Sequence, residues 1–267
     1  MNLKVLKYIL IIIFFSSCAN NKKNNAFEIT PKEELHTKGI QFLKIGKFDD
    51  AANNFKLIFE QYPTSKDLAE SELMYAYSLY LSTKYQDAYD VYKNWLLYFP
   101  AHEHNIYVKY MIFRCFFNQI NDVSRDQDKT RKALEIAIEL MHFTNSQDKY
   151  YQDVQSKIPL LYDYLAAEQI LIGMEQLKIN NPIAAINRFK KALIYPNTIH
   201  TPEILYRLIE SYIILGIDAQ ATKYFSILNY NYSDNIWNQI AIKNFNKYNW
   251  YKKYEKYIQN SNIKSID

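Results

Sequence analysis

The chain has 267 residues, 49% of them hydrophobic, and contains only four glycines and two cysteines. Such a length allows one large domain or two small ones, and this apolar share is enough to build a core. The formal net charge is +4, and it falls to +2 without Lys4 and Lys7, which lie in a segment expected to be removed. So weak a positive charge argues against nucleic-acid binding.

Residues 1–17 have the arrangement of a secretory signal peptide. Two lysines precede an apolar run from Tyr8 to Phe15, and Ser16 and Ser17 follow it. Eight apolar residues are too few to span a bilayer, which needs about 20. The order of basic, apolar and small residues is instead typical of a signal that is cleaved on export.

Cys18 directly follows this segment, and "FSSC" resembles the lipobox of bacterial lipoproteins, with Phe15 where leucine is usual. The resemblance implies cleavage before Cys18 and acylation of its thiol and of the new amino terminus, which anchors the chain stably. Because Ala19 follows the cysteine, where aspartate would resemble a retention signal of the inner membrane, we expect the outer membrane. The alternative is ordinary secretion with an incidental cysteine.

Residues 18–32 are expected to form the lipidated terminus and a disordered tether. The stretch 19–31 is polar and has no helical period. A flexible chain of that length reaches about 20 Å. The folded part would therefore hang close beneath the membrane.

From Glu33 to about Asp234, apolar residues recur at intervals of three and four, which predicts helices. Proline and polar clusters interrupt the pattern every 15–20 residues, and no stretch alternates like a strand. Small, aromatic, glycine and proline positions recur in the register of the 34-residue tetratricopeptide hairpin. The predicted fold class is therefore all-α, a tetratricopeptide-repeat solenoid of about five helical hairpins.

Five sets of small and aromatic residues follow one another in this register. The first two are Gly39, Phe42, Gly46, Phe48, Ala51, Phe55 and Pro63, then Ala76, Tyr85, Ala88, Tyr92 and Pro100. The last two are Gly173, Ala185, Phe189 and Ala192, then Tyr212, Gly216, Ala221 and Phe225. The third set is the least regular, with helices expected at 107–117 and 130–142 and with Ala133 and Ala137 packing between them.

All four glycines fall at repeat positions. Gly39 and Gly173 are expected where the two helices of a hairpin touch, so that a side chain would force them apart. Gly46 and Gly216 are expected to end first helices in the left-handed conformation that glycine adopts freely.

The sequence holds no glycine-rich phosphate loop, no G-x-S-x-G or H-E-x-x-H motif and no cluster of cysteines. His102 and His104 would point in different directions on a helix, and Cys115 is expected to be a small core residue. We therefore expect no enzyme activity, metal or cofactor. The polar residues Asp122 and Asp126 either bind charge or cap the helix that follows them.

Five residues predict an aromatic wall with one cationic end. Tyr77 and Tyr80 fall at positions that face the groove of tetratricopeptide hairpins. Tyr107, Tyr110 and Arg114 share one face of the next helix. Such a wall would hold an extended segment rich in aromatic residues. The alternative is ordinary packing between helices in a chain with 25 tyrosines.

Several stretches resemble the BamD family, the lipoproteins of outer-membrane β-barrel assembly. They are "FEQYPTS", "YAYSLYLSTKYQDA", "FPAHEHNIYVKYMIFR", "SRDQDKTRKA", "LAAEQILIGMEQLKINNPIAAINRF" and "NYNYSDNIW", and the likeness covers about residues 33–237. Two positions depart from the family pattern, His104 in place of asparagine and Tyr232 in place of proline.

The resemblance implies a membrane-tethered scaffold that helps to insert β-barrel proteins. The N-terminal repeats, 33–150, would receive the targeting segments of unfolded clients, which end in an aromatic residue that suits the wall. The C-terminal repeats, 151–237, would dock on a POTRA domain of the barrel subunit BamA. Arg188, with Asn187 beside it, matches the family arginine that pairs with an acidic residue there. Without the resemblance, Arg188 would be assigned to a solvated helix face.

Other Bam lipoproteins are further candidate partners. Residues 238–267, rich in lysine and aromatic residues, are expected to form a capping helix or a tail that touches anionic lipid or another subunit. The rival hypothesis for the whole chain is a pilotin or an adaptor of cell-wall hydrolases, which would share the lipobox and the repeats.

Overall fold

The computed structural model describes residues 29–247, and the side chains as far as Asn244. This part forms eleven α-helices and no strand, which confirms the predicted all-α class. The helices are α2 (Lys32–Lys44), α3 (Phe48–Gln61), α4 (Leu68–Leu81), α5 (Tyr85–Tyr98), α6 (Asn105–Phe117), α7 (Asp128–Phe143), α8 (Lys149–Lys178), α9 (Pro182–Ala192), α10 (Thr201–Ile214), α11 (Asp218–Asn231) and α12 (Ile236–Lys247). Cys18 and the predicted signal peptide lie outside the described residues.

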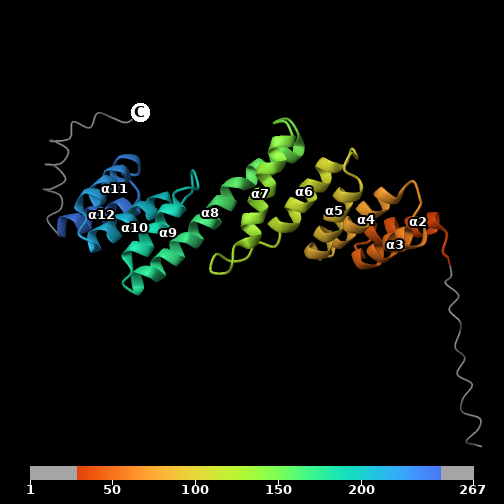
Figure 1. The fold of residues 1–267 in the computed structure, drawn as a ribbon, viewed down its shortest axis with the longest axis horizontal. Coiled ribbons are helices and arrows are strands. Elements are labelled where there is room, and N and C mark those ends of the chain that lie inside the picture. The colour runs from red at the N-terminus through yellow and green to blue at the C-terminus, as the bar shows by residue number, and fades with distance from the viewer. Residues whose placement is uncertain (1–28, 248–267) are drawn as a thin grey trace, which may run out of the picture.

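The helices pack in sequence as antiparallel pairs along one long axis (Figure 1). The hairpins are α2–α3, α4–α5, α6–α7, α8–α9 and α10–α11, and the first and last lie at opposite ends of the molecule. Each helix therefore contacts its neighbours in the chain, as expected for a solenoid of repeats.

One pair of positions recurs in the second helix of four hairpins and is fully buried. The small member is Ala51, Ala88, Ala185 or Ala221, and the aromatic member four residues later is Phe55, Tyr92, Phe189 or Phe225. In the irregular third hairpin, Ala133 and Ala137 are buried instead. Residues four apart share a helix face, so each pair directs one small and one large side chain at the first helix.

Gly39 and Gly173 lie in first helices, directly against aromatic rings of this pattern. A methyl group at Gly39 would lie 2.7 Å from the ring of Phe55, and one at Gly173 would clash with the ring of Phe189. The predicted role of both glycines in close helix packing is confirmed.

Four hairpins share one turn geometry. Residues Gly46, Thr83, Asn180 and Gly216 have φ values of 75°, 62°, 57° and 70°. The amide of the next residue then bonds back to the carbonyl five positions earlier, as in Lys47 to Phe42 at 2.9 Å and Lys84 to Leu79 at 3.0 Å. This Schellman motif satisfies the last carbonyls of each first helix. The left-handed turns predicted at Gly46 and Gly216 are confirmed.

The helix α8 is longer than the interval of 15–20 residues at which helix breaks were predicted. It runs for 30 residues with Pro159 inside it. A proline costs a helix one hydrogen bond, but the fully buried Val154 and Leu161 on either side hold this segment in place. The first part of α8 packs on α7 and the last part pairs with α9. A single helix thus joins the third hairpin to the fourth.

The helix α12 covers the open side of the last hairpin. Trp237, Ile240 and Ala241 pack against the residues of α10 and α11. Asn244 also donates a hydrogen bond to the hydroxyl of Tyr206, at 2.9 Å. The first part of the predicted capping segment is therefore a helix, and residues 248–267 lie outside the described part. None of the helices described is long and apolar enough to cross a membrane.

Candidate functional site

A hollow of about 560 Å³ opens on the face made by the first helices of successive hairpins. Its walls come from α2, α4, α6 with the residue before it, and α8. The lining residues are His36, Glu70, Leu73, Met74, Tyr77, His104, Tyr107 and Tyr150. A neighbouring hollow of about 370 Å³ shares His36, Glu70 and Met74, so the two form one groove along the N-terminal hairpins.

Two members of the predicted wall, Tyr77 and Tyr107, line this hollow. Burial raises the pKa of Tyr107 to about 12, so its hydroxyl stays neutral at physiological pH. The sequence did not predict Tyr150 as a lining residue. An irregular loop precedes α8, so the sequence pattern does not define which side of the first turn of α8 faces the groove. Its ring lies 6.2 Å from that of Tyr107 between centroids.

The other members, Tyr80, Tyr110 and Arg114, lie behind the hollow. Arg114 Nη1 donates to the Tyr110 hydroxyl at 2.8 Å, and that hydroxyl donates to Asp153 Oδ2 of α8 at 2.9 Å. The guanidinium carbon lies 5.8 Å and 5.7 Å from the ring centroids of Tyr80 and Tyr110. The structure therefore brings the five residues together, with two facing the groove and three packed between helices.

Asp153 is the acidic end of this internal group. Burial opposes its ionisation, but hydrogen bonds from Lys157 and Tyr110 lower the pKa of the carboxyl below its ordinary value. The charged carboxylate thus ties α8 to α6. Among the described residues, Arg114 forms no ion pair of its own. It reaches Asp153 only through the Tyr110 hydroxyl.

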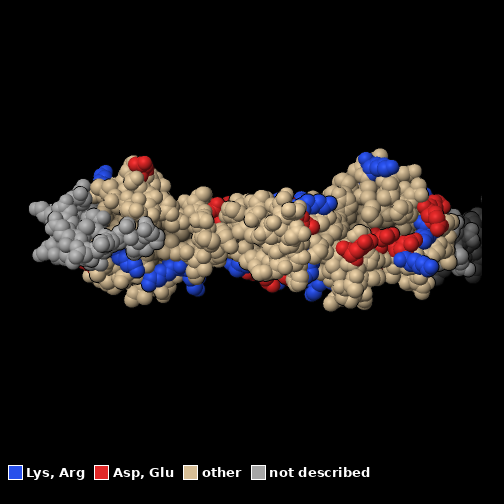
Figure 2. Space-filling model, turned by 90° about the horizontal axis from the view of Figure 1, so that it is seen from above, with Lys and Arg blue, Asp and Glu red and all other residues tan. Residues whose placement is uncertain are grey.

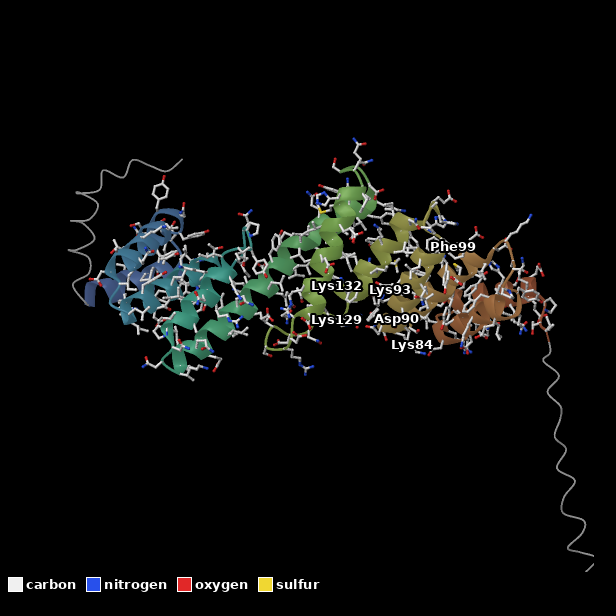
Figure 3. The ribbon with its side chains drawn as sticks, viewed as in Figure 1. Lys84, Asp90, Lys93, Phe99, Lys129 and Lys132 are labelled. Carbon is white, nitrogen blue, oxygen red and sulfur yellow. The ribbon has the colours of Figure 1, made fainter. Side chains whose placement is uncertain are left out.

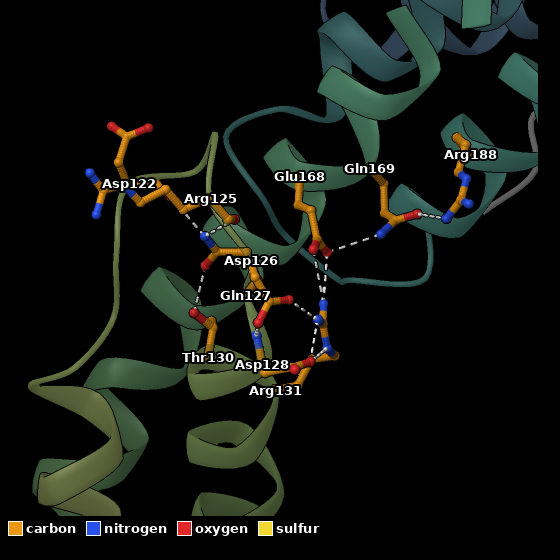
Figure 4. Close-up of polar contacts among 10 residues, drawn as sticks. All are labelled: Asp122, Arg125, Asp126, Gln127, Asp128, Thr130, Arg131, Glu168, Gln169 and Arg188. Carbon is orange, nitrogen blue, oxygen red and sulfur yellow. Dashed lines mark hydrogen bonds and ion pairs between the residues drawn. The ribbon is translucent and has the colours of Figure 1, made fainter. Parts of the chain in front are cut away.

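A second group of polar residues joins α7, α8 and α9 (Figure 4). We call Arg131, Glu168, Gln169 and Arg188 the polar chain. Arg131 Nη1 lies 3.0 Å and 2.9 Å from the two carboxylate oxygens of Glu168. Gln169 Nε2 donates to Glu168 Oε2 at 3.1 Å, and Arg188 Nη1 donates to Gln169 Oε1 at 3.3 Å. The chain therefore runs from the third hairpin to the fourth.

The loop before α7 holds Arg131 in place. Gln127 is buried, and its amide nitrogen donates to the carbonyls of Asp122 and Arg125 at 2.9 Å and 3.0 Å. Asp126 and Asp128 each accept a hydrogen bond from Arg131 Nη2. Asp122 accepts from Ser124 and so caps a turn within the loop.

Asn187 is exposed and Arg188 is half-buried, side by side on α9. Among the residues that the structure describes, no carboxylate oxygen lies within 4 Å of Arg188, whereas Arg131 pairs with three acids and Arg207 with two. Arg188 thus presents a cation that is oriented by Gln169 but not neutralised.

Several other charged side chains are paired within the chain. Of the lysines labelled in Figure 3, Lys84 just before α5 pairs with Asp49 at 3.0 Å, and Lys132 of α7 pairs with Glu135 at 2.9 Å. Figure 2 shows acidic side chains gathered at the N-terminal end and a largely uncharged surface along the middle of that face. Burial raises the pKa of the Cys115 thiol to about 12, so it stays protonated.

The rings of His102 and His104 lie 5.1 Å apart between centroids. Within residues 29–247, no three histidine, cysteine, aspartate or glutamate side chains are grouped so that they could hold an ion.

The repeated hairpins, their shared turns and the groove on their first helices define a tetratricopeptide-repeat protein. Residues 29–227 match the model of the YfiO family, described as an outer membrane lipoprotein. The chain belongs to this family.

Curated relatives support the same conclusion. The chain is 36% identical to the "Outer membrane protein assembly factor BamD" of Rickettsia prowazekii, over 91% of this chain and 98% of that one. It is 31% identical to the protein of the same name from Caulobacter vibrioides, over 86% and 76%. Among solved structures it is similar to the tetratricopeptide domain complex of yeast Sti1, at 12% identity, 86% and 92% coverage and a TM-score of 0.38, too distant to carry an argument.

Proposed function

We propose that this chain is an outer membrane protein assembly factor that works by binding and not by catalysis. It is anchored through acylated Cys18 to the periplasmic face of the outer membrane. The observation that carries this proposal is the similarity to the Rickettsia assembly factor, which extends over nearly the whole of both chains. The aligned region therefore spans the hairpins that carry the groove and those that carry the polar chain.

The N-terminal hairpins, 33–150, receive unfolded β-barrel clients. Their groove is supported as the binding place by its aromatic lining, Tyr77, Tyr107 and Tyr150, around an open hollow. Aromatic rings offer large contact areas at little cost in conformational entropy, and a client segment that ends in an aromatic residue fits this surface. Tyr80, Tyr110 and Arg114 support the wall from behind.

The C-terminal hairpins, 151–237, dock on a POTRA domain of BamA. Asn187 and Arg188 provide the contact, with Arg188 pairing with a carboxylate of the partner. The lack of an acidic partner for Arg188 within the described residues supports this role, since a half-buried cation gains most from an incoming acid. Other Bam lipoproteins complete the set of proposed partners.

Purification from outer membranes tests the proposal. The lipidated chain with a C-terminal tag should retain BamA as its main partner, and Arg188→Glu should lose it. Lys191→Glu is the matched control, because Lys191 is exposed on the same helix and the change of charge is identical. Retention of a secretin or an amidase in place of BamA would contradict the proposal.

A further inference from the structure

The polar chain contains one neutral residue, Gln169, between two charged groups. We propose that Gln169 is a positioning residue, which orients the guanidinium of Arg188 for a carboxylate of the docking partner while leaving its charge free. This inference rests on the docking role proposed for Arg188. It adds Gln169 to that site and explains why an amide stands there.

The orientation of the Gln169 amide follows from its neighbours. Its nitrogen donates to Glu168 Oε2 at 3.1 Å, and its oxygen accepts from Arg188 Nη1 at 3.3 Å. Turning the amide over would place its NH₂ group against the guanidinium and its oxygen against the carboxylate, and both contacts would be repulsive. The amide oxygen is therefore the atom that faces Arg188.

The carboxylate of Glu168 is itself fixed. It accepts from Arg131 Nη1 through both oxygens, and its side chain is only 14% exposed. Arg131 is held in turn by Asp126 and Asp128. The charge of Glu168 is thus engaged by Arg131, and what reaches Arg188 through Gln169 is a hydrogen bond without a negative charge.

A neutral acceptor has a specific advantage at this place. One bond from Nη1 restrains the guanidinium, and the planar group presents its remaining N–H donors in a fixed fork suited to a carboxylate. An acid at position 169 would hold Arg188 more strongly, but it would compete with the acid of the partner. The identity of residue 169 should therefore change the affinity for the partner independently of any change that it causes in stability.

The test measures the affinity of the full lipidated chain for full-length BamA in detergent. Gln169→Ala removes the acceptor, and Gln169→Glu replaces it with a competing charge. We expect each to weaken binding about tenfold, Gln169→Ala through the loss of one hydrogen bond to a charged group and Gln169→Glu through competition with the acid of the partner. Gln155→Glu is the control, because Gln155 is an exposed residue of the same helix. Because Gln169→Glu also sets a carboxylate against that of Glu168, 3.1 Å from the present amide nitrogen, the melting temperature of both variants is measured beside the affinity, and weaker binding by a variant that melts like the wild type supports the inference.

A double-mutant cycle separates positioning from a general structural effect. In the Arg188→Ala background, Gln169→Ala should cause no further loss, because Gln169 acts through Arg188. The inference is overturned if the loss of affinity caused by Gln169→Ala adds in full to that caused by Arg188→Ala. It is also overturned if both Gln169 variants bind like the wild type while Arg188→Glu does not. In both cases the docking proposal stands. If Arg188→Glu binds like the wild type, the docking proposal fails, and the inference fails with it.

Discussion

Gly39 of α2 lies directly against the ring of Phe55 in α3, so closely that a Cβ atom there would lie 2.7 Å from the ring. Replacing Gly39 with leucine should force the two helices apart and lower the free energy of unfolding by about 1–3 kcal/mol. Thermal denaturation followed by circular dichroism measures the change. A melting temperature equal to that of the wild type would contradict the packing described here.

Thr83 occupies the left-handed turn position that glycine holds in the first and fifth hairpins, with a φ of 62°. Because a β-branched residue is strained there, Thr83→Gly should stabilise the fold by about 1 kcal/mol. Chemical denaturation should show the midpoint moving upward. Asn180→Gly is the comparison and should gain less, since asparagine tolerates this conformation. Equal gains for both, or a loss for Thr83→Gly, would argue against strain at Thr83.

Asp153 links α8 to α6 through Tyr110, and the pKa of its carboxyl is lowered in the fold below the ordinary value of 3.8. The charged form therefore stabilises the fold above about pH 4, and this contribution is lost as the pH falls through the lowered pKa. Asp153→Asn should cost about 1 kcal/mol at pH 7, a value reduced for partial exposure. Urea titrations at pH 7 and pH 3 should show that cost become smaller at the lower pH. A cost that does not depend on pH would mean that the charge is not involved.

The three rings of the groove should contribute unequally to client binding and to stability. Tyr150→Ala removes a ring that both lines the hollow and packs against the core, so we expect some loss of stability and an affinity about fivefold weaker for a peptide that copies a client's aromatic carboxyl terminus. Fluorescence anisotropy with a labelled peptide measures this loss. Tyr230→Ala serves as the control, because Tyr230 is 76% exposed and lies at the other end of the molecule. Unchanged peptide affinity for Tyr150→Ala would remove this groove from the account.

Much of the fold could be predicted because the repeat leaves local signals. The small and aromatic pairs, such as Ala51 with Phe55, stand four residues apart and identify the hairpins without any long-range information. The turn at Thr83 carries no such signal, since a β-branched residue rarely adopts the left-handed conformation, whereas Asn180 tolerates that conformation without requiring it. The length of α8 was not predicted from the expected spacing of helix breaks, because Pro159 lies inside this helix between the fully buried Val154 and Leu161.

The candidate site was harder to predict, since its contacts join distant segments. Arg131 and Glu168 are 37 residues apart, and Gln169 and Arg188 are 19 apart. The resemblance to a known family selected Arg188, but nothing local pointed to Gln169. Periodicity placed the five wall residues near one another, yet only the packed structure separates Tyr77 and Tyr107, which line the hollow, from those behind it.

We propose that one end of the solenoid receives clients while the other docks on the insertase. Photo-crosslinking in living cells examines both ends in one experiment, with the crosslinking residue placed at position 77 or at position 187 of the full chain. Position 77 should capture unfolded β-barrel proteins and position 187 should capture BamA. Capture of BamA from position 77 and of clients from position 187, or of neither from both, would contradict it.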